Sequence, residues 1–347
     1  MGTTSDAGPG APRGKRVTIV DVAERAGVAI SSVSSALNNR PGVSEATRLR
    51  IVEAAAELGF TPSLRGKSLS GKRAYAVGLV VQRNPDVLEL DPFFGAFIGG
   101  VEAYLDERDY ALVLQMSADA AQTLDRYRRL AGDRRVDGVF LNELEVDDPR
   151  TDLVRELELP AVAVNPSAQC PVPAVRQDFG AAIRALIGHF ASTGHRRVAH
   201  VSGPMNYLHA VQRVDAWRAA LREFGLEEGA LVSGEFTYEG GLAATATIAA
   251  DAASTAVFCA NDLSALGLIA GLERRGISVP DRVSVAGFDG IQLGEYVHPA
   301  LTTVRTAPRR IGYEAARLLL ATIESGTAQD ADVEPAELVL RDSTRSF

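Results

Sequence analysis

Polar and aromatic side chains follow several short apolar runs in the chain and could together bind a small molecule. In chain order they are Asn165, Phe236, Asn261 and Asp289. Arg213 lies in a helical stretch between two of these runs. A guanidinium fork, carboxylate and amide groups and a ring face are suited to recognising a sugar or a planar ring. Each residue also has an ordinary role open to it, as a helix cap, a surface charge or a core ring.

The apolar runs themselves predict the parallel sheets that would position these side chains. Runs at 76–81, 111–115, 136–141 and 161–164 alternate with helical stretches such as 94–107 and 121–132, and the cycle restarts at 197, 231, 256 and 283. Such alternation predicts parallel sheets with helices on both faces. Ligands of such sheets bind at the carboxyl ends of the strands, which is where the polar side chains are expected.

A second group of polar side chains lies near the N-terminus. Two short helices are predicted over residues 18–37, with a capping box of Thr18 and Asp21 and a turn at Gly27. A third is predicted from Ser44 to Leu58. Its apolar stripe, which should close a three-helix core, is Ile51, Val52, Ala55 and Leu58. The second helix presents an outward row of hydroxyls and an amide, which suits a DNA groove. A plain helical hairpin is the alternative.

The charge distribution favours nucleic acid as the partner of this N-terminal segment. Residues 1–73 hold 11 basic and 6 acidic residues, a net charge of +5, whereas the remainder holds 25 and 38, a net charge of −13. Phosphate attracts the first segment and is repelled by the second.

Several classes of protein are disfavoured by what the sequence lacks. The five histidines show no metal-ligand spacing, and no nucleophile elbow or phosphate loop is present, so we expect neither an enzyme nor a cofactor. The absence of a signal core or a membrane-length apolar run predicts a cytoplasmic, nucleoid-associated protein that does not bind membranes. Cys170 and Cys259 lie far apart and are expected to be free thiols.

Five motifs occur in order between Val17 and Arg73: Thr-Ile-x-Asp-Val-Ala, Ala-Gly-Val, Val-Ser-x-x-Leu-Asn, Val-Ser-x-x-Thr-Arg and Leu-Gly-Phe-x-Pro. By these motifs the chain resembles the lactose-repressor (LacI/GalR) family of transcriptional regulators, and the resemblance continues through the rest of the chain. It implies an α/β protein with an N-terminal three-helix helix-turn-helix headpiece followed by a two-lobed periplasmic-binding-protein-like core of parallel sheets.

The resemblance also implies the domain boundaries. We expect a disordered tail at 1–16, a DNA-binding domain at 17–61, a hinge helix or linker at 62–73 and an effector-binding core at 74–347. Within the core, subdomain one should span about 74–165 and 305–330, and subdomain two about 166–304 and 331–347.

The family's base-reading positions fall on Ile30, Ser31 and Ser35. The third is usually arginine, whose bidentate contact with guanine contributes about 1–3 kcal/mol of discrimination. Because serine cannot make this contact, we expect operator half-sites that differ from those of relatives that carry arginine. The phosphate-contacting positions fall on Ser32, Ser34 and Asn38.

The family's minor-groove hinge falls on a segment that includes Gly66 and Leu69. Leu69 takes the position of the leucine that wedges into the central base step. Gly66 replaces an alanine and costs a helix about 0.5–1 kcal/mol. We therefore expect Gly66→Ala to tighten operator binding.

The resemblance adds Phe93, in Asp91-Pro92-Phe93-Phe94, to the candidate effector-binding residues. The full set is Phe93, Asn165, Arg213, Phe236, Asn261 and Asp289. A sugar or sugar-like effector fits this set best, and a nucleobase is next. Three features depart from the family: Asp178-Phe179 replaces an Asp-Asn pair, Gly290 replaces a polar residue, and the loop from Gln82 to Asp91 is long.

The resemblance implies a repressor that binds a palindromic double-stranded operator as a homodimer and responds to a small-molecule effector. Because no leucine heptad follows Arg341, a dimer is expected rather than a tetramer tied by a coiled coil. The alternative is a small-molecule (sugar) binding protein without a DNA function.

Overall fold

The computed structural model describes residues 17–37, 41–60, 73–83 and 91–345. The chain divides after Arg73 into two compact units. The expected tail at 1–16 and the positions Asn38, Gly66 and Leu69 lie outside the described residues.

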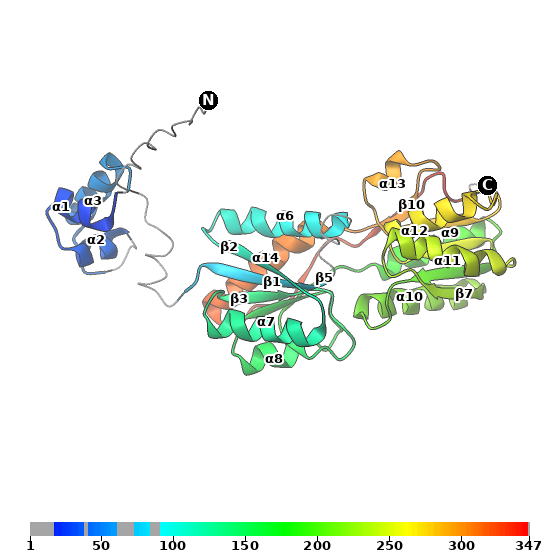
Figure 1. The fold of residues 1–347 in the computed structure, drawn as a ribbon, viewed down its shortest axis with the longest axis horizontal. Coiled ribbons are helices and arrows are strands. Elements are labelled where there is room, and N and C mark those ends of the chain that lie inside the picture. Colours follow the sequence, from blue (N-terminus) through cyan, green and yellow to red (C-terminus); the bar gives the residue numbers. More distant parts are fainter. Residues whose placement is uncertain (1–16, 38–40, 61–72, 84–90, 346–347) are drawn as a thin grey trace, which may run out of the picture. The chain divides into compact units, whose positions relative to one another are not determined.

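The first unit contains α1 (Ile19–Ala26), α2 (Ile30–Leu37) and α3 (Glu45–Glu57) (Figure 1). Thr18 and Asp21 form the expected capping box at the start of α1, and Gly27 ends that helix with φ +63°. The Ser44 side chain accepts from Thr47 N and begins α3. The helices bury a small core of their own, formed by Val22, Ala23, Ala26, Val33, Ala36, Ile51, Ala54 and Ala55.

One residue of the expected apolar stripe was assigned wrongly. The Val52 side chain is 48% exposed, whereas Ala54 is buried. In a helix, positions i, i+3, i+4 and i+7 share one face. Ile51, Ala54, Ala55 and Leu58 follow that spacing, and Val52 is one residue out of phase.

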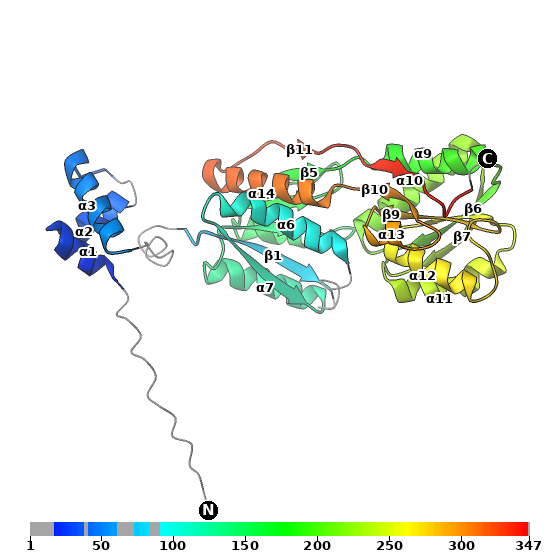
Figure 2. The ribbon, with the colours of Figure 1, turned by 90° about the horizontal axis from the view of Figure 1, so that it is seen from above.

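The first lobe of the second unit is built on a six-stranded sheet in the order β11-β5-β4-β3-β1-β2, in which every pair is parallel. The strands are β1 (Ala76–Gln82), β2 (Ala111–Ser117), β3 (Gly138–Leu141), β4 (Ala161–Val164), β5 (Ala174–Arg176) and β11 (Ala331–Asp332). On one face lie α6 (Pro92–Asp106) and α14 (Pro308–Ser325), and on the other α7 (Ala120–Gly132) and α8 (Arg150–Glu156) (Figures 1 and 2).

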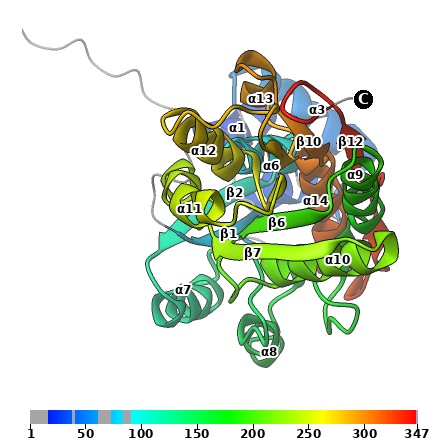
Figure 3. The same cartoon turned by 90° about the vertical axis from the view of Figure 1, so that its right-hand side faces the viewer.

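The second lobe repeats this plan around a sheet in the order β12-β10-β9-β8-β6-β7. Its strands are β6 (Arg197–Ser202), β7 (Glu227–Ser233), β8 (Ala256–Cys259), β9 (Ser284–Asp289), β10 (Thr302–Arg305) and β12 (Glu337–Val339), and only the pairing of β12 with β10 is antiparallel. On one face are α9 (Gly180–Ser192) and α10 (Leu208–Phe224), and on the other α11 (Tyr238–Ala250) and α12 (Asp262–Glu273) (Figure 3). The short α13 (Leu293–Tyr296) follows β9.

The chain crosses from one lobe to the other at positions that differ from the expected subdomain limits. The strand β5 pairs with β4 and β11 pairs with β5, so residues 174–176 and 331–332 belong to the first lobe. The expected limits near 165 and 330 gave these residues to subdomain two. Strands of two and three residues are too short to show a periodic pattern, which is why the sequence did not reveal them.

Glycines let paired helices approach closely in both lobes. A Cβ atom at Gly100 of α6 would lie 1.9 Å from Arg309 O, and one at Gly312 of α14 would lie 2.1 Å from Phe97 O. In the second lobe, a Cβ at Gly267 of α12 would lie 1.9 Å from Tyr238 O. These positions exclude any side chain because backbone meets backbone.

Both cysteines are free thiols, Cys259 buried in β8 and Cys170 half-buried in a loop. Among the described helices, none has the length and apolar character needed to cross a lipid bilayer.

Candidate functional site

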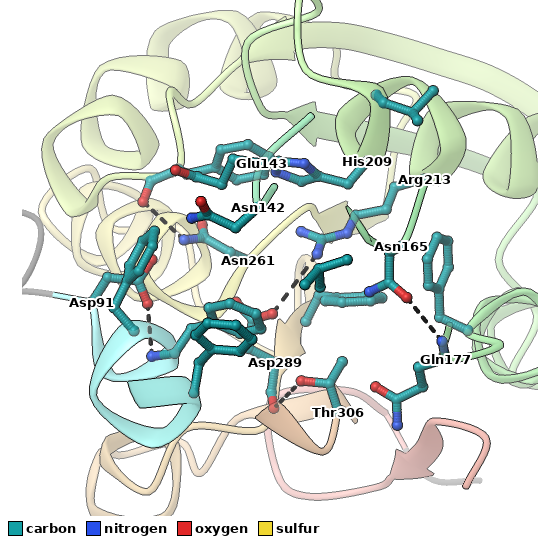
Figure 4. A pocket seen from close by; sticks show the side chains of 18 of the residues that line it. Asp91, Asn142, Glu143, Asn165, Gln177, His209, Arg213, Asn261, Asp289 and Thr306 are labelled. Atoms are coloured by element: carbon teal, nitrogen blue, oxygen red, sulfur yellow. Dashed lines mark hydrogen bonds and ion pairs between the residues drawn. The ribbon is translucent and has the colours of Figure 1, made fainter. Parts of the chain in front are cut away.

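The six candidate effector-binding residues line one pocket between the lobes (Figure 4). The first lobe supplies Phe93 from the start of α6 and Asn165 from the end of β4. The second lobe supplies the others, which are Arg213 from α10, Phe236, Asn261 and Asp289. Strand ends of both sheets therefore face the same space, as expected for parallel sheets.

Arg213 and Asp289 form the charged centre of the second lobe's wall. Arg213 Nη1 donates to Ala260 O at 2.5 Å, and the guanidinium carbon lies 3.8 Å from the centroid of the Phe288 ring. Arg213 Nη2 lies 3.9 Å from Asp289 Oδ1. Neither Arg213 Nε nor Asp289 Oδ1 has a hydrogen-bond partner among the described residues.

Burial dominates the electrostatics of this pair. It lowers the pKa of Arg213 and raises the pKa of Asp289 well above its usual value, and the neighbouring guanidinium only partly offsets the second effect. The pair is too far apart for a good hydrogen bond. A ligand group that reached both side chains could supply the missing hydrogen bonds.

Asn165 connects the pocket to the segments that join the lobes. Its backbone has φ +47°, and its side-chain Oδ1 accepts from Gln177 N at 2.8 Å. Gln177 in turn donates from Nε2 to Glu334 O at 2.8 Å and accepts at Oε1 from Ala307 N at 3.2 Å. Gln177 thus hydrogen-bonds to both of the other chain segments that pass between the lobes.

Asn261 lines the pocket, but its side chain is already engaged. Its Oδ1 accepts from Ser264 N at 3.0 Å and caps α12, and its Nδ2 donates to Phe236 O at 2.8 Å. The helix-cap role, which the sequence left open, is the one observed. Through the second bond Asn261 also fixes the loop that carries Phe236.

Phe236 belongs to a wall of stacked rings. Its ring lies 5.0 Å from that of His209 at 19°, and His209 lies 5.5 Å from Tyr207 at 27°. Gly203 makes room for the wall, since a Cβ there would lie 2.0 Å from Phe236 Cζ. Burial, with Arg213 and Arg83 nearby, lowers the pKa of His209 well below its usual value, so this ring is neutral. The strand that was expected to begin at 231 is β7 (Glu227–Ser233), which ends before Phe236 and leaves that residue in a loop with φ +57°.

Several polar lining residues that the sequence analysis did not select come from the first lobe. Arg83 pairs with Glu143 at 2.5 Å and covers the Tyr207 ring at 4.8 Å. In the described part of the chain, Glu143 Oε2 and both polar atoms of the Asn142 amide have no hydrogen-bond partner. These residues follow β1 and β3 just as Asn165 follows β4. The same rule, applied to every strand end, would have found them.

Asp91 also lines the pocket, from the end of the long loop noted in the sequence. Its Oδ1 accepts from Phe93 N at 3.0 Å and caps α6. Burial raises the pKa of Asp91 above its usual value. Residues 84–90 of the same loop lie outside the described residues.

A short β-bridge joins the lobes beside the pocket. Val146 N donates to Asn206 O at 2.9 Å, and Leu208 N donates to Leu144 O at 2.8 Å. Tyr207 adds a hydrogen bond from its hydroxyl to Gln82 O at 3.3 Å. Residues 144–146 and 206–208 are called the clasp below.

The predicted DNA-reading helix is α2 of the first unit. Ile30 is 47% exposed and Ser31 is exposed, while Ser32, Ser34 and Ser35 are half-buried. Val33 and Ala36 are buried on the opposite side. The predicted contact positions that the structure describes therefore lie on the side of α2 away from its core.

Comparison with known proteins places the chain in a family. A family described as "Bacterial regulatory proteins, lacI family" matches residues 18–63, and "Periplasmic binding protein-like domain" matches residues 187–344. The HTH-type transcriptional regulator CelR of Thermobifida fusca is 35% identical over 334 residues, which cover 94% of this chain and 96% of that relative. The chain belongs to the LacI family of bacterial regulatory proteins. The HTH-type transcriptional repressor PurR of Photobacterium profundum is 31% identical over 338 residues, which cover 95% and 99% of the two chains.

Solved structures of LacI-family regulators share the fold. A CelR–cellobiose complex aligns with a TM-score of 0.72 at 33% identity, over 94% of this chain and 100% of that one. A lac repressor dimer bound to operator and the anti-inducer ONPF aligns with a TM-score of 0.83 at 25% identity, over 96% and 100%. This LacI-family protein is a DNA-binding transcriptional regulator, and the alternative of a sugar-binding protein without a DNA function is not favoured. Its relatives are regulators rather than enzymes.

Proposed function

We propose that this LacI-family protein is a repressor that binds a palindromic operator as a homodimer and is controlled by a saccharide in the pocket between its lobes. The observation that carries the effector assignment is the set of buried polar atoms there without protein partners among the described residues. They belong to Asn142, Glu143, Arg213 and Asp289, from both lobes. Each unmet group of this kind costs about 1–3 kcal/mol, which a ligand's hydroxyls would recover.

The shape of the pocket suits a sugar ring. The stacked rings of His209 and Phe236 offer an apolar face on the second lobe, and Phe93 offers another on the first. Sugars combine apolar ring faces with hydroxyls around the rim, and aromatic walls with polar groups between them match both parts. The solved CelR–cellobiose complex supports the same assignment.

A nucleobase is the second candidate, because flat aromatic rings also stack on planar ligands. The relatives of this chain include PurR repressors. The experiment below separates the two classes.

The regulation follows from linkage. A ligand held by both lobes favours one angle between them, and it changes operator affinity only by its preference for that arrangement. Binding alone performs this function, without catalysis, and we expect the protein to act on DNA in the cytoplasm. Two headpieces are needed because one contacts few phosphates, which favours a dimer on a two-fold symmetric site.

The test of the effector is a thermal-shift screen of mono- and disaccharides, with cellobiose among them, and of purine bases. A bound ligand raises the melting temperature by mass action. Arg213→Ala and Asp289→Ala should abolish the shift. Arg218 lies on the same helix as Arg213, and Arg218→Ala, which removes only an exposed ion pair with Glu228 of β7, should leave the shift unchanged. A full shift in both pocket variants would contradict the proposed site.

The test of the operator is binding of the full-length protein to a palindromic site selected from random duplexes. Affinity should fall steeply with salt concentration and change when the hit ligand is added. If the ligand lowers the affinity for the operator it is an inducer, and if it raises that affinity it is a co-repressor. Equal affinity for selected and random DNA would contradict a specific repressor.

A further inference from the structure

We infer that Gln177 is a positioning residue that sets the angle between the two lobes, by holding together the three chain segments that cross between them. The first crossing runs from β5 to α9 (residues 177–179), the second from β10 to α14 (residues 306–307) and the third from β11 to β12 (residues 333–336). Gln177 begins the first crossing and hydrogen-bonds to both of the others. The inference goes beyond the proposed function, and the measurement that tests it needs no effector.

Backbone hydrogen bonds already join the first and third crossings. Val333 N donates to Arg176 O at 2.9 Å, and Ala336 N donates to Asp178 O at 2.7 Å. These two bonds lie on either side of Gln177 along the first crossing. The first and third crossings are therefore expected to move as one unit when the lobes rotate.

The second crossing joins this unit through the side chain of Gln177. Gln177 Oε1 accepts from Ala307 N at 3.2 Å, and Gln177 Nε2 donates to Glu334 O at 2.8 Å. One amide group thus connects the second crossing to the third. The bond to Ala307 is the longer of the two, and it is the bond that a change of lobe angle would stretch first.

The two partners determine the type and the orientation of this side chain. Ala307 N can only donate and Glu334 O can only accept, so the amide oxygen must face the first and the amide nitrogen the second. Glutamine supplies both groups from one neutral side chain. Gln177 is 6% exposed, so little of its amide is free to exchange these partners for water.

Gln177 also connects the crossings to the pocket, which it lines (Figure 4). Its backbone N donates to the Asn165 side chain at 2.8 Å. In the second crossing, Thr306 N and Thr306 Oγ1 donate to Asp289 O at 3.1 Å and 3.3 Å. A displacement of Asn165 or Asp289 is thus passed to a segment that Gln177 ties to the other two.

The test measures the distance between the lobes in the full-length protein without a ligand. Nitroxide labels are attached at Ala121→Cys in the first turn of α7 and at Glu239→Cys in the first turn of α11, and both positions are exposed. Cys170 is replaced by serine, and Cys259 is buried. Labelled protein is diluted with unlabelled protein, so that double electron–electron resonance reads the distance within one protomer.

Two variants remove the connection in different ways. Gln177→Met has a similar shape but makes neither side-chain hydrogen bond. Gln177→Asn keeps the amide and is one methylene shorter, so it cannot reach both partners. Because each variant loses bonds that favour one lobe angle, we expect each to widen the distance distribution by about 1.5-fold or more.

Two controls separate this role from a general loss of stability. Gln169→Met makes the same chemical change at an exposed glutamine of the first lobe. Val139→Ala shortens a buried side chain of β3, in the core of the first lobe, and lowers the stability of that lobe. Both controls should keep the parent's distance distribution, the second despite a lower melting temperature.

The outcomes decide the inference. If Gln177→Met and Gln177→Asn keep a distribution as narrow as the parent's, Gln177 does not set the lobe angle, even if their melting temperatures fall. A widening that Val139→Ala reproduces also overturns the inference, because loss of stability would then explain it. Since the measurement uses neither ligand nor DNA, a failure here is distinct from a failure of the proposed effector or operator.

Discussion

Replacing Gly100 with alanine should force α6 away from α14 and destabilise the first lobe. The new Cβ would lie 1.9 Å from Arg309 O, where an ordinary van der Waals contact is 3.4–4 Å. The backbone of α14 is the neighbour, so no side-chain rotation relieves the overlap. The helices must separate by more than an ångström, or α6 must slide.

The magnitude follows from two opposing terms. Overpacking of a close-packed core costs about 1–3 kcal/mol and sometimes more. Alanine in a helix recovers about 0.5–1 kcal/mol relative to glycine. We expect a net loss of about 1–2 kcal/mol, or roughly 2–8 °C in the melting temperature of a unit this size.

The matched control is Gly95→Ala in the same helix. Gly95 is exposed, and a Cβ there would meet nothing within 4 Å. This variant should gain stability from helix propensity alone. Guanidinium unfolding followed by circular dichroism measures both variants.

A functional measurement completes the experiment. Because α6 begins at the pocket with Phe93, its displacement in Gly100→Ala should also weaken the binding of the effector found in the screen. Gly95→Ala should bind as the parent does. If Gly100→Ala proved as stable as Gly95→Ala, the reasoning about backbone contact would be refuted.

Three further predictions concern other parts of the chain. Burial lowers the pKa of His195 to about 4 and of His200 to about 3, below the ordinary 6.5. As the pH falls below 6.5, these histidines take up protons in the unfolded chain before they do so in the folded chain. The free energy of unfolding is therefore highest above pH 6.5 and falls by about a few kcal/mol as the pH drops toward 4. Equal melting temperatures at pH 7.5 and 5 would contradict this. Tyr207→Phe removes the hydrogen bond from the clasp to Gln82 O, worth about 0.5–1.5 kcal/mol, and should weaken effector binding by about 2- to 10-fold in calorimetry. Unchanged affinity would show that this bond does not help to hold the lobes together around the effector. Asp21→Ala breaks the capping box of α1 and should lower the stability of the first unit by about 1 kcal/mol, seen as faster amide hydrogen exchange there and not in the second unit.

Much of the pocket was predictable because parallel strands end at a common edge. Asn165 and Asp289 needed only an apolar run and the polar residue that follows it. Arg83 and Glu143 follow β1 and β3 in the same way, although they were not among the predicted residues. The role of Asn261 could not be predicted in the same way. The sequence shows that an amide side chain is present, but not that Ser264 N and Phe236 O already form hydrogen bonds with it.

Other features depend on contacts that no local pattern encodes. Gly290, which departs from the family's polar residue, has φ +76°, and a Cβ there would lie 2.9 Å from Arg305 Cα. The neighbouring strand therefore determines the residue type. The short strands β5 and β11 exist only because the sheet edge beside them offers a partner.

The strands β11 and β12 have a consequence for how the protein is made. β11 completes the first sheet, and β12, only a few residues later, completes the second. A nascent chain still on the ribosome can bury the small core of its first three helices early, but it cannot finish either sheet until residues 331–339 have been added. A premature stop codon shortly before Ala331 would thus damage both lobes at once, and the resulting chain would carry a DNA-reading end without a working sensor.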